Sequence, residues 1–140
     1  MYRIVIDTNV WVSALRSRRG ASYGLLSRID SGRFQVCVSV PLILEYEHAS
    51  RQILGQIGLT DADVGHILDY VCTVAHRQSI FYLWRPLLKD SNDDLVLELA
   101  VAAACDYIVT YNVKDFVGSE RFGVKITTPK EFLEKIGVLP

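Results

Sequence analysis

Residues 4–10 read Ile-Val-Ile-Asp-Thr-Asn-Val, and this stretch introduces the pattern from which the fold is predicted. Ile4 to Ile6 form a short apolar run rich in β-branched residues, which is typical of a buried strand. Asp7 ends the run, and residues 9–15 favour one or two turns of helix. A strand that leads directly into a helix predicts the first unit of an α/β fold.

Strands and helices alternate along the rest of the chain. Further strands are expected over residues 34–38, 79–83, 107–110 and 124–126. Helices are expected over residues 21–31, 41–54, 60–71, 93–104 and 128–137, with a break at 55–58 and a loop at 86–91. Pro41 suits the first turn of one helix, and Thr60 with Asp63 resembles a capping box at the start of another. The alternation predicts βαβ units and a mostly parallel sheet.

Length and composition indicate one folded domain over residues 1–140. Half of the residues are hydrophobic and 22% are charged, which excludes a disordered chain and a coiled coil. The net charge of −1 argues against a protein that coats nucleic acid by bulk positive charge. The charge is uneven, however, because residues 1–33 carry +4 and residues 86–120 carry −5.

The cysteines and the apolar stretches indicate a cytoplasmic protein. Three cysteines are widely spaced at positions 37, 72 and 105, which suits neither a zinc site nor a disulfide framework. Asp7 comes too soon for a signal peptide. No uncharged apolar stretch approaches the roughly 20 residues that span a bilayer. We therefore expect a soluble protein with no membrane association.

Acidic and amide side chains occur where parallel sheets place their active sites. They are Asp7 after the first strand, Glu45 early in the helix after the second strand, Asp93 and Asp94 at the start of a later helix, and Asn112 and Asp115 after the strand at 107–110. The carboxyl ends of parallel strands meet at one edge of a sheet, so these side chains can converge in one crevice.

Converging carboxylates suit a metal site. They repel each other, so they hold protons or share a cation, and oxygen ligands select Mg²⁺ or Mn²⁺. Such a site suits the hydrolysis of phosphodiesters by a metal-activated water. Taken singly, each residue is better explained as a helix cap, a turn residue or a solvated acid. Their joint placement at one sheet edge favours the metal site.

At these residues the chain resembles the PIN-domain family, the ribonuclease fold of VapC-like toxins. The matching blocks are Ile4-Val5-Ile6-Asp7-Thr8-Asn9-Val10, Leu42-Ile43-Leu44-Glu45-Tyr46, Asp93-Asp94-Leu95-Val96-Leu97-Glu98-Leu99-Ala100 and Tyr107-Ile108-Val109-Thr110-Tyr111-Asn112-Val113-Lys114-Asp115-Phe116. Their order and spacing agree from about residue 3 to residue 133. The resemblance implies a three-layer α/β/α sandwich and a Mg²⁺- or Mn²⁺-dependent endoribonuclease, the toxin of a type II toxin-antitoxin system. It also implies a homodimer and a small antitoxin partner.

The resemblance also assigns roles to individual residues. Asp7, Glu45 and Asp94 match the catalytic acids of the metal site. The supporting residues are Thr8, Asn9, Asp93 and Thr110. Asn112 departs from the pattern, because many relatives have Asp there, and this puts a second metal in doubt. Asp115 is the residue that can partly compensate for the missing charge.

The basic loop at residues 16–20 has two candidate partners. Arg16, Arg18 and Arg19 can grip RNA phosphates, since guanidinium groups suit bidentate phosphate contacts. The same side chains can receive an acidic antitoxin segment. A solvated loop without a partner explains them equally well.

Two other functions fit part of the sequence. One is a non-catalytic PIN-fold module that binds RNA or protein, which the neutral Asn112 leaves open. The other is a haloacid-dehalogenase-like phosphatase, which also places Asp after its first strand. That chemistry needs a second Asp two residues later, where this chain has Asn9, so the phosphatase is disfavoured.

Overall fold

A computed structural model describes residues 1–80 and 91–140, with side chains described from residue 93 in the second segment. Its centre is a five-stranded sheet formed by β1 (Tyr2–Ile6), β2 (Phe34–Val38), β3 (His76–Arg77), β4 (Tyr107–Val109) and β5 (Lys125–Thr127). The strand order is β3-β2-β1-β4-β5, and every neighbouring pair is parallel. The predicted α/β fold with a mostly parallel sheet is confirmed.

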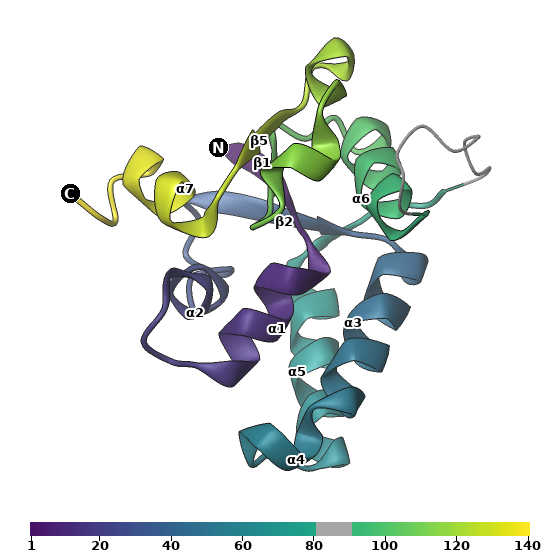
Figure 1. Ribbon diagram of the computed structural model, residues 1–140, viewed down its shortest axis with the longest axis vertical. Helices are drawn as coiled ribbons and strands as arrows, with labels where there is room; N and C mark the ends of the chain where they lie inside the picture. The colour runs from purple at the N-terminus through teal and green to yellow at the C-terminus, as the bar shows by residue number, and fades with distance from the viewer. Residues whose placement is uncertain (81–90) are drawn as a thin grey trace.

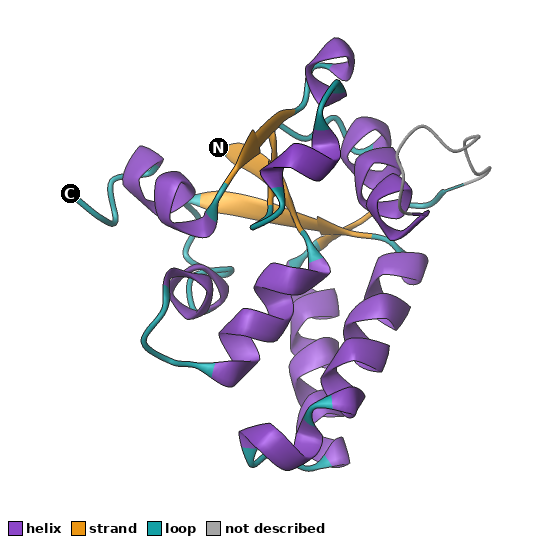
Figure 2. Cartoon of the chain, in the orientation of Figure 1, coloured by secondary structure: helices purple, strands orange, loops and turns teal. Residues whose placement is uncertain are grey.

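Helices flank the sheet on both sides (Figures 1 and 2). They are α1 (Thr8–Arg16), α2 (Ala21–Leu26), α3 (Val40–Gln52), α4 (Leu54–Ile57), α5 (Asp61–Val74), α6 (Ser91–Ala102) and α7 (Pro129–Lys135). Figure 1 shows α1, α3 and α5 on one side of the sheet and α6 on the other. Two 3₁₀ helices, η1 (Val113–Phe116) and η2 (Ser119–Phe122), connect β4 to β5.

The order of the strands creates a switch point beside β1. The chain leaves β1 toward β2 and β3, and then crosses back to place β4 on the other side of β1. Ligands bind at such switch points in open α/β sheets, outside the carboxyl ends of the strands. Asp7 and Thr110 follow the two strands that meet there, so the fold places both residues at the expected binding edge.

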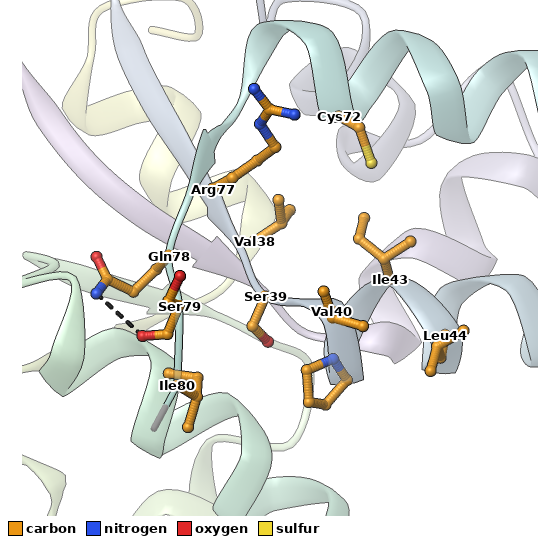
Figure 3. A pocket seen from close by; sticks show the side chains of 11 residues that line it. Val38, Ser39, Val40, Ile43, Leu44, Cys72, Arg77, Gln78, Ser79 and Ile80 are labelled. Atoms are coloured by element: carbon orange, nitrogen blue, oxygen red, sulfur yellow. Dashed lines mark hydrogen bonds between the residues drawn. The ribbon is translucent and has the colours of Figure 1, made fainter. Parts of the chain in front are cut away.

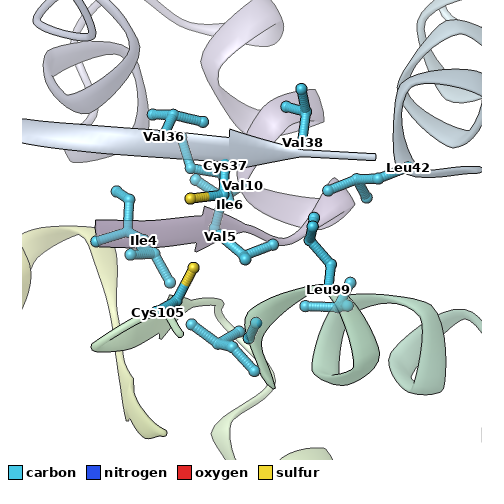
Figure 4. Close-up of a cluster of buried hydrophobic side chains, with 14 of the residues drawn as sticks. Ile4, Val5, Ile6, Val10, Val36, Cys37, Val38, Leu42, Leu99 and Cys105 are labelled. Carbon is cyan, nitrogen blue, oxygen red and sulfur yellow. The ribbon is translucent and has the colours of Figure 1, made fainter. Parts of the chain in front are cut away.

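The core lies between the central strands and the helices (Figure 4). Ile4 and Val5 of β1 are fully buried, which confirms this run as a buried strand. The ring of Trp11 on α1 stacks on the ring of Tyr46 on α3, with centroids 4.5 Å apart. The Tyr46 hydroxyl donates a hydrogen bond to the Ile6 carbonyl. Helix α3 is therefore tied directly to the last residue of β1.

Several local predictions are confirmed. Pro41 lies in the first turn of α3. Thr60 and Asp63 form the capping box of α5, because the Thr60 hydroxyl accepts from the Asp63 N–H and the Asp63 carboxylate accepts from the Thr60 N–H. The segment predicted as an exposed basic loop, residues 16–20, is exposed.

Most predicted boundaries shift by a few residues, and three differences have a clear structural reason. Helix α2 ends at Leu26 instead of residue 31, because the N–H groups of residues 28 and 29 bond three residues back and form turns. The break at 55–58 includes the short α4, which ends at Gly58 with a φ of 67°. The strand predicted over 79–83 is wrong at its start, since β3 pairs His76 and Arg77 with β2 and no strand includes residues 79–80. Residues 81–83 of that predicted strand, and residues 86–90 of the predicted loop, lie outside the described residues.

Within the described part of the chain, no helix combines the length and apolar character that crossing a membrane requires.

Candidate functional site

Asp7 is fixed at the carboxyl end of β1 by two hydrogen bonds. It caps α1, and its Oδ1 accepts from the Thr8 N–H over 2.8 Å. Its Oδ2 accepts from the Thr110 hydroxyl over 2.7 Å. Only 7% of Asp7 is exposed, and Thr110 is fully buried. The carboxylate is therefore held in one orientation by the neighbouring strand and by its own helix.

Thr110 also organises the loop that follows β4. Its Oγ1 accepts from the Asn112 N–H over 3.0 Å and from the Asn9 amide over 3.4 Å. The Asn9 side-chain oxygen accepts from the Tyr111 N–H over 3.3 Å. Thr110 and Asn9 thus join the start of α1 to the loop after β4, which is the arrangement expected of residues that support Asp7.

A second set of acids lies on α6. Asp93 and Asp94 are each 9% exposed, and Glu98 is 5% exposed. Helix α6 packs against β1, β2 and β4. Because burying ionised carboxylates is costly unless opposite charges or hydrogen bonds offset it, buried acids mark a place where positive charge is favoured.

Glu98 was not among the predicted site residues. It lies four residues after Asp94, so the two side chains share one face of α6. The signal in the sequence was its place in an otherwise apolar stretch, residues 95–101, which is typical of a helix buried on all sides.

The remaining predicted residues are less enclosed. Glu45 is half-buried in the second turn of α3, while Asn112 and Asp115 are exposed. Among the residues that the structure describes, no three His, Cys, Asp or Glu side chains are grouped closely enough to hold a metal ion. Asp7, Thr8, Asn9, Thr110 and Asn112 are therefore joined by hydrogen bonds, but a cage of three described acids is not formed.

The chemistry of these donors nevertheless fits a hard cation. Every predicted ligand offers oxygen, the donor that Mg²⁺ and Mn²⁺ prefer. Mg²⁺ retains several waters and binds through one or two carboxylates, so acids that are spread along an edge can share it through water. The residues thus suit a partly hydrated ion better than one enclosed by protein oxygens.

Tyr46 lies near Asp7, but its hydroxyl does not act in proton transfer. Burial, and then the nearby charge of Asp7, raise the pKa of Tyr46 well above its usual value. The neutral phenol donates a hydrogen bond to the Ile6 carbonyl. Tyr46 consequently supports the end of β1 immediately before Asp7.

The predicted RNA-binding arginines lie at the other end of α1. Arg16 lies eight positions after Thr8, which is about 12 Å along the helix. The Arg16 guanidinium donates to the Gln56 side chain over 3.4 Å, toward α4. Arg18 and Arg19 line a different hollow, next to α2. The structure therefore separates Arg16 from the other two.

A pocket of about 380 Å³ opens beside the carboxyl ends of β2 and β3 (Figure 3). Val40 and Leu44 of α3 form one wall, and Arg77 and Gln78 form the other. The Gln78 amide donates to the Ser79 carbonyl over 3.2 Å, and its oxygen is 3.0 Å from His76 Nε2. The pocket adjoins the helix that carries Glu45. Sequence reasoning missed it because its walls come from segments far apart in the chain.

Comparisons with known proteins identify the family and the fold. The PIN domain family model matches residues 3–114. The fold is similar to that of a chain in the crystal structure of VapBC2 from Rickettsia felis bound to a DNA fragment from their promoter. The TM-score is 0.59 at 15% identity, covering 90% of this chain and 98% of that chain. No curated protein sequence matches significantly.

Proposed function

This chain belongs to the PIN-domain family, and from that premise we propose that it is an endoribonuclease that hydrolyses RNA phosphodiester bonds with Mg²⁺ or Mn²⁺. PIN domains are typically metal-dependent nucleases. The observation that carries the proposal is the buried Asp7 carboxylate, which Thr110 and the Thr8 N–H orient at the switch point of the sheet. Asp94 lies buried on α6, which packs against the same strand.

In this proposal, Asp7, Glu45 and Asp94 hold the ion, and Asn112 or Asp115 assists them. A bound ion supplies an activated water and polarises a phosphoryl oxygen. The Thr110 hydroxyl and the Thr8 N–H orient Asp7 so that its oxygens need not reorganise when the ion binds.

Charge supports a single ion more than two. Asn112 brings no negative charge, so the negative charge at the carboxyl end of β4 is too small to balance a second divalent cation. Asp93 is close in sequence to Asp94 and is also buried, so it adds negative charge beside α6 without needing to be a direct ligand.

Binding of the RNA strand is assigned to arginines from the N-terminal third. Arg18 and Arg19 are exposed in the loop after α1, where they can reach phosphate groups. Arg16 is the weaker contributor, because its guanidinium already contacts Gln56.

We further propose that the protein is the toxin of a type II toxin-antitoxin system, that it forms a homodimer, and that a small antitoxin restrains it in the cytoplasm. The support is the likeness of its fold to a chain of the VapBC2 complex.

The nuclease proposal is tested by incubating purified protein with RNA in Mg²⁺ and in EDTA. We expect cleavage in Mg²⁺ only, and loss of cleavage in Asp7→Asn. Asp69→Asn is the matched control, because Asp69 is an exposed acid on α5. If Asp7→Asn cleaves as well as the wild type, the site assignment is wrong. If the wild type binds RNA but does not cleave it, the non-catalytic RNA-binding module becomes the better description.

A further inference from the structure

Tyr111 lies in the segment that connects β4 to η1, between two residues of the candidate site. Thr110 before it donates its hydroxyl to Asp7 Oδ2 over 2.7 Å. Asn112 after it donates its N–H to Thr110 Oγ1 over 3.0 Å. Because the three residues are consecutive, a shift of Tyr111 would displace both of its neighbours relative to Asp7.

Tyr111 is attached to two different helices. Its N–H donates to the Asn9 side-chain oxygen at the start of α1 over 3.3 Å. Its hydroxyl is hydrogen-bonded to the Ser22 hydroxyl on α2. Helix α2 packs against both α1 and α7, so Ser22 belongs to a firmly held element. The segment after β4 is thus fastened to a packed pair of helices.

A hydrogen bond at its far end fixes the Tyr111 side chain. Tyr111 is 46% exposed, so packing covers only about half of it. Ser22 is fully buried, and a buried hydroxyl without a hydrogen bond is costly. Among the described residues, Tyr111 is the side chain that bonds to Ser22. Each of the two hydroxyls therefore stabilises the position of the other.

The other attachments of this segment are weaker. The two hydrogen bonds that the Asn9 side chain makes with it measure 3.3 and 3.4 Å, which is long for N–H···O bonds. Asn112, the residue that follows, is exposed. The bond to Ser22 is therefore the firm attachment of the segment beyond Thr110.

From these contacts we infer that Tyr111 is a positioning residue: its hydroxyl, held by Ser22, keeps residues 110–112 in place so that Thr110 orients Asp7 before a metal ion binds. The inference rests on the proposed function and extends it to a side chain on α2. A site that has its binding arrangement for only part of the time binds more weakly by that fraction. Direct contact of the exposed ring with RNA is the alternative, and the variants below separate the two.

The inference is tested with Tyr111→Phe, which removes the hydroxyl and keeps the ring. Binding of Mn²⁺ is measured without RNA, from the electron paramagnetic resonance signal of the free ion. Cleavage of RNA is measured at a Mg²⁺ concentration below saturation. The matched control is Tyr70→Phe, because Tyr70 lies on α5, is 41% exposed and donates its hydroxyl to Asp30 Oδ2 over 2.7 Å.

Loss of one neutral hydrogen bond makes the held arrangement roughly two- to tenfold less favoured. The Mn²⁺ affinity and the cleavage rate of Tyr111→Phe should fall by about that factor, while its RNA affinity in EDTA stays within about twofold of the wild type. Ser22→Ala should have a similar effect. Combining Ser22→Ala with Tyr111→Phe should lower both quantities no further, because the two hydroxyls form one bond. Thermal unfolding confirms that each variant is folded, and Tyr111→Phe alone decides if Ser22→Ala disturbs α2.

Equal Mn²⁺ binding and cleavage by Tyr111→Phe and Tyr70→Phe would overturn the inference, and cleavage by the wild type would leave the proposed nuclease intact. Unchanged Mn²⁺ binding in Tyr111→Phe, together with weaker RNA binding in Tyr111→Leu, would also overturn it and assign the ring to direct contact with RNA. Weaker Mn²⁺ binding in Tyr111→Phe, when the wild type cleaves no RNA, would support the positioning role while refuting the nuclease proposal. A wild type that neither binds Mn²⁺ nor cleaves RNA would overturn both.

Discussion

Replacing Thr110 by valine tests whether the orientation of Asp7 matters for cleavage. The substitution keeps the shape of the side chain and removes the hydroxyl that donates to Asp7 Oδ2 over 2.7 Å. Hydrogen bonds to charged groups contribute about 1.5–3 kcal/mol. If that contribution is lost in the transition state, kcat/KM falls by roughly 10- to 150-fold, because each 1.36 kcal/mol is a factor of ten.

The assay is the rate of cleavage of an RNA reporter, measured together with the concentration of Mg²⁺ that gives half the maximal rate. Thr110→Ser retains the hydroxyl and should keep most of the activity. Thr127→Val makes the same change at the end of β5, where the hydroxyl bonds only to the Thr128 carbonyl among described groups. A kcat/KM for Thr110→Val within twofold of the wild type, or an equal loss in Thr127→Val, would refute the reasoning.

Three further predictions concern the surroundings of the site. Tyr46→Phe removes the buried hydroxyl that donates to the Ile6 carbonyl, so the free energy of unfolding in urea should fall by about 1–3 kcal/mol; an unchanged unfolding midpoint would contradict this. Burial and the charge of Asp7 raise the pKa of Tyr46 in the folded state. The stability from its neutral phenol is therefore present below about pH 10 and is lost as the pH rises further, so Tyr46→Phe should flatten the alkaline decline of the unfolding free energy. Glu98→Gln should weaken cation attraction by roughly 1 kcal/mol, or about fivefold in the half-saturating Mg²⁺ concentration. The exposed Glu120→Gln should leave that concentration unchanged, and identical curves for both variants would exclude a role for Glu98.

The sequence was sufficient for the central part of the fold. Apolar β-branched runs locate β1, β2 and β4, and a parallel sheet then dictates that Asp7 and Thr110 lie at one edge. Single residues also predicted where two helices begin, since Pro41 lies in the first turn of α3 and Thr60 forms the capping box of α5.

Features that depend on distant parts of the chain were not predictable. Strand β3 has two residues, too few for any periodicity, and only its pairing with β2 defines it. The apolar residues around Glu98 indicate a buried helix, but they do not indicate which distant strands cover it. The hollow between the loop after α1, α2 and α7 is lined by both Arg28 and Lys130, which are more than 100 positions apart, so no sequence window includes both.

The charge summed over the chain was also a poor guide to partners. A net charge of −1 conceals buried acids on α6 and four cationic side chains that line one hollow beside α2. Opposite charges that lie apart in space cancel in the sum, although one small chain then carries an acidic edge and a basic surface.

Asp7 caps α1 and also lies at the edge of the sheet where we propose that the metal ion binds. These two roles affect how libraries of variants are interpreted. Asn caps helices as well as Asp does, whereas Ala forfeits about 0.5–2 kcal/mol. In a library scored by protein abundance in cells, Asn at position 7 should therefore be tolerated and Ala depleted. A library scored by RNA cleavage should deplete both. The difference between the two scores for Asn then isolates the chemical role of this carboxylate from its role in starting a helix.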